Sequence, residues 1–134
     1  MILYKHFTKS YYRDVDKMGI VYYSRYFEYF EEARTELLDN IGLNISEVEK
    51  KGIELPVISA HCDYKKSAFI NQDLIVETYI KELPKTRLKI EYEVYNNKSK
   101  EVLVLGYTIH VFIKSNGRPT KIPDFILNKI NQYF

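Results

Sequence analysis

The spacing of apolar residues predicts one long helix set among strands. From Tyr26 to Ile41 apolar residues recur with helical periodicity: Tyr26, Phe27, Phe30, Ala33, Leu37, Leu38 and Ile41. Asn40 and Gly42 supply a stop signal. The opposite face is acidic and polar, as expected where a helix meets solvent: Glu28, Glu31, Glu32, Thr35 and Asp39. This is the longest and most apolar helical pattern in the chain, so we expect it to be the central helix.

Strands are expected on both sides of this helix. The first runs from Ile2 to Tyr12, and an irregular stretch from Arg13 to Tyr22 leads into the helix. A short second helix is predicted to begin with the capping box Ser46–Glu49. From 53 to 113 the chain reads as strands joined by turns, and Pro123 opens a terminal helix.

Alternation within these strands predicts which faces are buried. Leu88 to Val94 alternates cleanly with charged residues, whereas 102–113 is apolar on both faces and is expected at the centre of the sheet. Ile58, Ala60, Cys62 and Tyr64 form another expected apolar face. A lone long helix must bury its apolar stripe, and a twisted antiparallel sheet curled round it is the natural partner. The pattern therefore predicts an α+β fold.

Bulk properties narrow the class of protein. A chain of 134 residues with 46% hydrophobic and 28% charged residues is typical of one globular domain, expected to span 1–134. The single cysteine, Cys62, excludes an intramolecular disulfide and favours a reducing compartment. With no secretory signal and no apolar run near the roughly 20 residues of a membrane span, we expect a cytoplasmic protein. The net charge is only +2, and acidic and basic residues are interleaved along the chain, which argues against nucleic-acid binding.

The segment from Tyr12 to Arg34, YRDVDKMGIVYYSRYFEYFEEAR, carries a specific motif. It resembles the signature of the 4-hydroxybenzoyl-CoA thioesterase family, which includes the acyl-CoA thioesterases linked to the Tol–Pal envelope system. That signature is an aspartate pair D-x-D, a glycine three residues later, V-x-Y/H and E-x-A-R. The matching residues are Asp14, Asp16, Gly19, Val21, Tyr23, Glu31, Ala33 and Arg34. The later Arg118 to Pro123 also fits the family pattern.

This resemblance implies a fold and a reaction. The fold would be the hotdog arrangement, an antiparallel sheet of about five strands wrapped around the long helix. The reaction would be hydrolysis of an acyl-coenzyme A thioester without a cofactor, with Asp16 and Tyr23 as catalytic residues. Asp16 would act either as nucleophile or as general base. Elementary chemistry agrees, because free N–H groups at the following helix start, near Tyr23, can stabilise an oxyanion.

The resemblance also implies supporting residues. Gly19 and Val21 shape the loop, and Glu31 lines the site in some branches, although a simple intrahelical pair with Arg34 explains Glu31 equally well. Asp14 fits a capping or salt-bridged role at least as well as catalysis. Tyr23 stands where many Tol–Pal members have histidine, and members acting on aromatic acyl groups can carry tyrosine there.

Substrate contacts are expected outside the motif. By resemblance the acyl pocket is lined by Leu55, Pro56 and Val57, and the nucleotide is contacted by Lys85, Thr86 and Arg87. Coenzyme A carries phosphates, so basic residues should flank the cleft, and Lys65 and Lys66 are further candidates.

The sequence offers little support for metal, thiol or serine-hydrolase chemistry. His6, His61 and His110 lack metal-ligand spacing, Cys62 is expected to be a buried inert thiol, and no G-x-S-x-G motif occurs. A hotdog dehydratase would need a D-x-x-x-x-H loop, which is absent. A non-catalytic module that binds acyl-CoA or acyl carrier protein is the alternative function.

An open sheet edge after the last strand predicts a homodimer or homotetramer. The expected binding partner is acyl-CoA, or an acyl group on acyl carrier protein.

Overall fold

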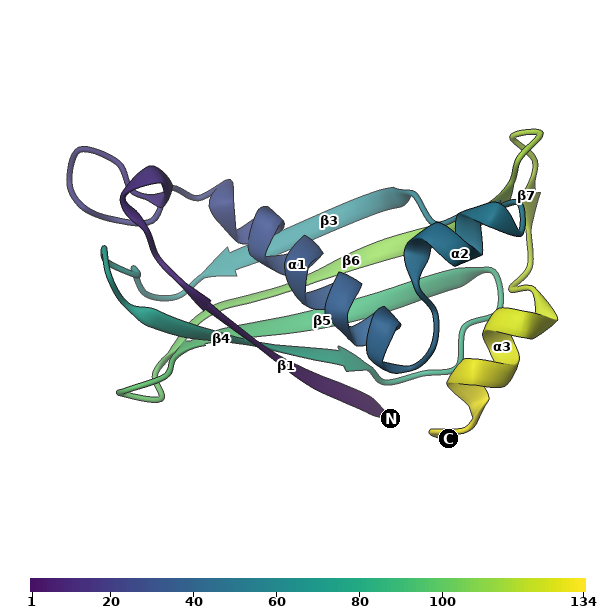
Figure 1. Cartoon of the computed structure of the whole chain (residues 1–134). Helices are drawn as coiled ribbons and strands as arrows, with labels where there is room; N and C mark the ends of the chain where they lie inside the picture. The colour runs from purple at the N-terminus through teal and green to yellow at the C-terminus, as the bar shows by residue number, and fades with distance from the viewer.

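Five long strands form one antiparallel sheet, and helix α1 lies across it in the computed structural model, which describes residues 1–134 (Figure 1). The strand order is β1–β4–β5–β6, with β3 on the other side of β6. The long strands are β1 (Ile2–Lys9), β3 (Val57–Tyr64), β4 (Asp73–Ile80), β5 (Arg87–Asn96) and β6 (Val102–Lys114). The remaining elements are η1 (Tyr12–Asp14), α1 (Arg25–Asn40), α2 (Ile45–Lys50), β2 (Ile53–Glu54), β7 (Pro119–Thr120) and α3 (Asp124–Asn131). The predicted α+β hotdog architecture is confirmed.

The core lies between α1 and the sheet. The buried residues of α1 are Tyr26, Tyr29, Phe30, Ala33, Leu37 and Leu38. Phe30 stacks on Tyr92 of β5 with ring centroids 4.2 Å apart. The predicted helical stripe is confirmed apart from one exchange, since Tyr29 is buried and Phe27 is only half-buried.

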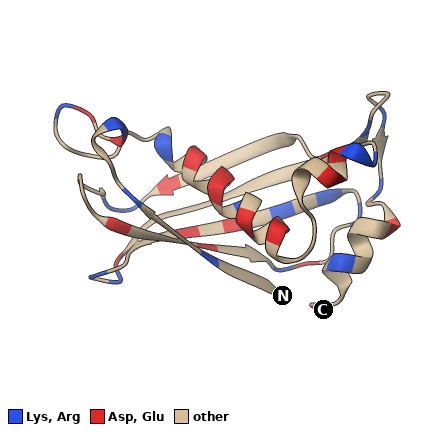
Figure 2. Cartoon of the chain, in the orientation of Figure 1, with Lys and Arg blue, Asp and Glu red and all other residues tan.

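The outer face of α1 is acidic, as its polar positions predict. Figure 2 shows acidic residues following one another along this helix. The imidazole of His6 on β1 lies between two of them, with Nε2 2.9 Å from Glu32 and Nδ1 2.6 Å from Glu36. This cluster ties the edge strand β1 to the helix. No helix in the chain is both long enough and apolar enough to span a membrane.

Gly106 of β6 lets α1 approach the sheet closely. A Cβ at this position would lie 2.6 Å from the His61 carbonyl oxygen and 2.7 Å from the Phe30 ring. We therefore expect Gly106→Ala to lower the free energy of unfolding by about 2 kcal/mol, because overpacking a dense core displaces neighbours. Urea unfolding measures this, and Ser59→Ala on the neighbouring strand should change the midpoint little. An unchanged midpoint for Gly106→Ala would contradict the close packing.

Two predicted boundaries are wrong. Strand β1 ends at Lys9 rather than Tyr12, and the side chain of Ser10 then accepts a hydrogen bond from Gln72 N–H (2.9 Å), which turns the chain out of the sheet. The capping box at Ser46 does not form, because the Asn44 side chain caps α2 instead and accepts from Ser46 N–H (3.0 Å) and Glu47 N–H (3.3 Å). Helix α2 accordingly begins at Ile45.

Strand β3 differs most from its prediction. Its expected core residues Ile58, Ala60 and Tyr64 are exposed, and only Cys62 is half-buried. Helix α1 packs over β1 and β4, so the alternating apolar residues of β3 have no layer to cover them. The free edges of the sheet are β1 and β3, whereas the last long strand, β6, lies between β5 and β3. The prediction of an open edge after the last strand is wrong in its position.

Candidate active site

Asp16 lies in a tight loop between η1 and α1, at the end of the molecule opposite α3 (Figure 1). Its Oδ1 accepts hydrogen bonds from the N–H groups of Met18 (2.8 Å) and Ile20 (3.3 Å). Backbone bonds from Asp16 N–H to the Ile20 carbonyl and from Gly19 N–H to the Asp16 carbonyl close the loop. Gly19 has φ +76°, a conformation that glycine adopts without strain. The loop therefore fixes one carboxylate oxygen and leaves the other, Oδ2, without a partner in the chain.

The carboxylate of Asp16 borders a pocket of about 360 Å³. The pocket is lined by the loop, by the first turn of α1 and by the end of β3 with the residues after it: Asp16, Ile20, Val21, Tyr22, Tyr23, Tyr26, Tyr64, Lys65, Lys66 and Ser67. Val21 is buried, and its N–H donates to the Ala68 carbonyl (2.9 Å), which holds the loop against the segment after β3. The structure thus brings Asp16, Gly19, Val21 and Tyr23 together.

Tyrosine rings form the apolar wall of this pocket. Tyr64 meets Tyr23 and Tyr26 edge-on, with centroids 6.4 Å and 5.6 Å apart. Burial raises the pKa of Tyr26 to about 12. Burial also raises the pKa of the Cys62 thiol beside Tyr64, so this thiol is not activated as a nucleophile.

The residues just before α1 present free N–H groups, and one of these residues, Tyr23, lines the same pocket as Asp16. The helix begins at Arg25, so Tyr23 lies in the turn that precedes it. Neither the Tyr23 N–H nor the Ser24 N–H donates to any group in the chain. Two adjacent donors at a helix start are suited to a developing negative charge.

Asp14 and Glu31 are placed away from this chemistry. Asp14 is buried and accepts a hydrogen bond from Tyr11 N–H (2.8 Å), with Arg25 Nε 4.0 Å away. These contacts fit the capping and salt-bridged role expected for Asp14. Glu31 is exposed on the outer face of α1, and the pair with Arg34 does not form. The Arg34 guanidinium instead lies near His110, where burial and then this charge lower the imidazole pKa.

The predicted substrate-binding segments lie at the other end of the sheet. Val57 begins β3 and Arg87 begins β5, and both strands run antiparallel to β6, so their first residues share one end. Tyr64, beside Asp16, ends β3 seven residues later, about 23 Å away at roughly 3.3 Å per residue. Leu55, Pro56 and Val57 and Lys85, Thr86 and Arg87 are therefore not brought to Asp16 within one chain. The carbonyl of Leu55 accepts from His110 Nδ1 (3.0 Å), which anchors this segment.

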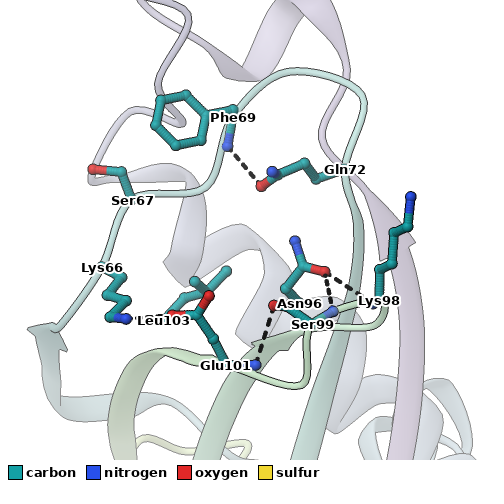
Figure 3. Close-up of a pocket in the computed structure, with 9 residues that line it drawn as sticks. All are labelled: Lys66, Ser67, Phe69, Gln72, Asn96, Lys98, Ser99, Glu101 and Leu103. Atoms are coloured by element: carbon teal, nitrogen blue, oxygen red, sulfur yellow. Dashed lines mark hydrogen bonds and ion pairs between the residues drawn. The ribbon is translucent and has the colours of Figure 1, made fainter.

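Lys65 and Lys66 are the basic residues that lie beside Asp16. Lys66 forms an ion pair with Glu101. Lys66 and Ser67 line the Asp16 pocket and also a larger open hollow of about 710 Å³ (Figure 3). Polar residues from the loop between β3 and β4 and from the turn between β5 and β6 line this hollow, including Gln72, Asn96 and Ser99. The surroundings of Asp16 are thus polar and cationic on one side and aromatic on the other.

The sequence did not indicate several residues of the pocket. Tyr26 and Tyr64 read as core positions of a helix and a strand, and Ile20 and Ser67 carried no signal at all. Only the fold shows that they converge on one carboxylate. No group of three or more histidine, cysteine or acidic side chains is arranged to hold a metal ion.

Known proteins resemble this chain in sequence and in fold. Residues 12–130 match the family model of the thioesterase-like superfamily. A Bacillus subtilis protein named "Putative acyl-CoA thioesterase YneP" is 34% identical over 109 residues, 81% of this chain and 78% of that protein. A DHNA-CoA thioesterase from Staphylococcus aureus is 29% identical with a TM-score of 0.87, covering 98% of this chain and 93% of that one. A solved 4-hydroxybenzoyl CoA thioesterase, 20% identical, has the same fold, with a TM-score of 0.86 and coverage of 96% of this chain and 99% of that one.

Proposed function

The chain belongs to the thioesterase-like superfamily and is a thioester hydrolase, and we propose that it cleaves acyl-coenzyme A thioesters in the Asp16 pocket. The observation that carries this proposal is a carboxylate oxygen with no partner in the chain, in a tyrosine-lined pocket that also contains Tyr23, where two successive N–H groups, those of Tyr23 and Ser24, are free. These are the parts that thioester hydrolysis needs: a base or nucleophile, an oxyanion site and an apolar place for the acyl group.

The reaction follows from these parts. The thioester carbonyl oxygen accepts hydrogen bonds from the N–H groups at Tyr23 and Ser24. Asp16 either removes a proton from water, which attacks the carbonyl carbon, or attacks that carbon itself and forms a mixed anhydride that water then opens. In both routes the C–S bond breaks, and the products are the free acid and coenzyme A. The charge of Lys65, which has no acidic partner in the chain, favours an anionic substrate, whereas that of Lys66 is paired with Glu101.

A substrate panel tests this proposal. Benzoyl-CoA, butyryl-CoA, decanoyl-CoA and the matching acyl carrier protein thioesters are incubated with the enzyme, and the released thiol is measured. We expect hydrolysis of at least one acyl-CoA. Failure to cleave any thioester in the panel would refute the proposed function, and cleavage of the carrier-protein thioesters alone would replace the substrate class.

The nucleotide end of coenzyme A is proposed to contact Lys85, Thr86 and Arg87. We expect Lys85→Ala and Arg87→Ala each to raise KM for acyl-CoA up to about ten-fold, since a hydrogen bond to a charged group contributes roughly 1.5 kcal/mol. The value of kcat should stay nearly unchanged, because the phosphates lie far from the reacting carbonyl. Steady-state kinetics with acyl-CoA and acyl-pantetheine measure both effects.

Lys5→Ala, at an exposed lysine on the edge strand β1, is the control for loss of one positive charge. An equal rise in KM with acyl-pantetheine, which has no nucleotide, would remove Lys85 and Arg87 from the nucleotide site.

A further inference from the structure

The hydroxyl of Tyr64 reaches the turn that precedes α1. Tyr64 ends β3, and its Oη donates a hydrogen bond to the Tyr23 carbonyl (2.9 Å), 41 residues earlier in the chain. The Tyr64 ring separately packs against the rings of Tyr23 and Tyr26. The hydroxyl and the ring therefore make different contacts, and a phenylalanine would keep only those of the ring.

The backbone of this turn explains why the Tyr23 carbonyl needs a donor. In a regular α-helix the carbonyl of residue 23 would accept from the N–H of residue 27. Here Phe27 N–H donates to the Ser24 carbonyl (3.2 Å) and Arg25 N–H donates to the Tyr22 carbonyl (2.9 Å). This tight turn leaves the Tyr23 carbonyl without a backbone partner, and Tyr64 provides the only donor.

Fixing the Tyr23 carbonyl also fixes the direction of the Ser24 N–H, because both belong to one peptide group. The carbonyl and N–H of one planar trans peptide point in opposite directions. The bond from Tyr64 therefore orients the Ser24 N–H, just as the bond from Arg25 N–H to the Tyr22 carbonyl orients the Tyr23 N–H. Both N–H groups are free of partners, and Tyr23, which carries the first and directly precedes the second, lines the pocket that contains Asp16.

We propose that Tyr64 is a positioning residue that holds the Tyr23–Ser24 peptide so that two adjacent N–H groups form the oxyanion site. This inference rests on the proposed thioester hydrolysis. Without the hydroxyl, the Tyr23 carbonyl is free to turn towards Phe27 N–H and complete a regular helical turn. The Ser24 N–H then no longer points towards the oxyanion, and the transition state loses one of its two hydrogen-bond donors.

Tyr64→Phe tests this role. Removal of one oxyanion donor lowers kcat by roughly 100-fold or more, and loss of its alignment should lower kcat at least about ten-fold. KM should stay nearly constant, and so should the Kd of a non-hydrolysable thioether analogue of the substrate, because the ground-state pocket keeps its ring. Benzoyl-CoA and butyryl-CoA from the substrate panel serve as the probes.

Two variants are matched controls. Tyr79→Phe removes a tyrosine hydroxyl that donates to Glu77 (2.6 Å) on β4, outside the Asp16 pocket, and Cys62→Ser changes the other polar group beside Tyr64. Both should keep kcat within about two-fold, as expected of groups that touch no donor of the oxyanion site. A similar loss of kcat in all three variants would point to general damage to the pocket and overturn the specific role of the Tyr64 hydroxyl.

An independent measurement reads the peptide itself. In ¹⁵N-labelled protein, Tyr64→Phe should shift the amide resonance of Ser24 more than that of Tyr22, whether or not a substrate is cleaved. A wild-type enzyme that hydrolyses the panel while Tyr64→Phe keeps its kcat would overturn this inference alone. A wild-type enzyme that hydrolyses nothing would instead overturn the proposed function, and an unmoved Ser24 resonance would then overturn the positioning role as well.

Discussion

Asp16→Asn is expected to lower kcat for acyl-CoA hydrolysis by roughly 100-fold or more, because the amide is neither a base nor a nucleophile. The substitution is unusually clean at this position. Asparagine retains an Oδ1 that can accept from Met18 N–H and Ile20 N–H, so the loop keeps its hydrogen bonds. The substitution removes the negative charge and replaces Oδ2, the oxygen without a partner, by an amide nitrogen. Stopped-flow or steady-state release of thiol from the best substrate of the panel measures the effect.

Asp14→Asn is the matched control two residues away. Asp14 is buried with Arg25 and the Tyr11 N–H as neighbours, so its substitution should lower stability more than turnover. A loss of kcat that is as large for Asp14→Asn as for Asp16→Asn, at equal unfolding midpoints, would contradict the assignment of Asp16.

Oxygen labelling separates the two roles open to Asp16. In a single turnover in H₂¹⁸O, general-base catalysis places the solvent oxygen in the product acid. Nucleophilic catalysis, when water opens the anhydride at the Asp16 carbonyl, places an enzyme oxygen in the product and leaves ¹⁸O on Asp16. Mass spectrometry of the product and of the peptide containing Asp16 distinguishes these outcomes.

The fold was predictable because its main signals are local. The helical stripe of α1 and the alternation of Leu88 to Val94 follow from burial on one side of an element, which periodicity reports directly. The errors have two sources. Asn44, two residues before Ser46, takes the cap position and starts α2 one residue earlier, and β3 is uncovered because α1, distant in sequence, lies over β1 and β4.

The candidate site was predictable only in part, for a similar reason. The residues from Asp14 to Tyr23 are contiguous, so a motif can carry them, and the structure gathers Asp16, Val21 and Tyr23 at one pocket, with Gly19 in the loop that holds Asp16. Tyr64 reaches the same pocket from another strand, and no spacing in the sequence reports that contact. The cytoplasmic location, the extent of the single domain and the assembly stay predictions.

The assembly is the feature that would unite the divided substrate site. Strand β3 offers an unpaired edge, and Val57 (42% exposed), Ile58 (48%) and Tyr64 (47%) leave it with exposed apolar side chains. We propose that two copies pair their β3 strands antiparallel about a two-fold axis. Pairing centred on the middle of the strand would set Val57 of one copy opposite Tyr64 of the other, which closes the gap of about 23 Å between the two halves of the site.

Mass in solution gives the first measurement of this pairing. We expect light scattering at assay concentration to report a dimer or a dimer of dimers of the 16.0 kDa chain. A fully active monomer would refute the shared site, because one chain alone leaves Leu55 to Val57 and Lys85 to Arg87 far from Asp16.

Complementation between two inactive variants is the stronger experiment. One variant is Asp16→Asn, and the other is Val57→Asp, which places a charge in the segment proposed to line the acyl pocket. After the subunits are mixed and exchanged, a shared site leaves each mixed dimer with one intact pocket and one doubly altered pocket. Random exchange makes half of the dimers mixed, so activity should recover to about a quarter of the wild-type value. A mixture of Asp16→Asn with Asp16→Ala, both altered on the same side, should recover none. If the Val57→Asp mixture also stayed inactive although mixed dimers formed, each pocket would be built from a single chain.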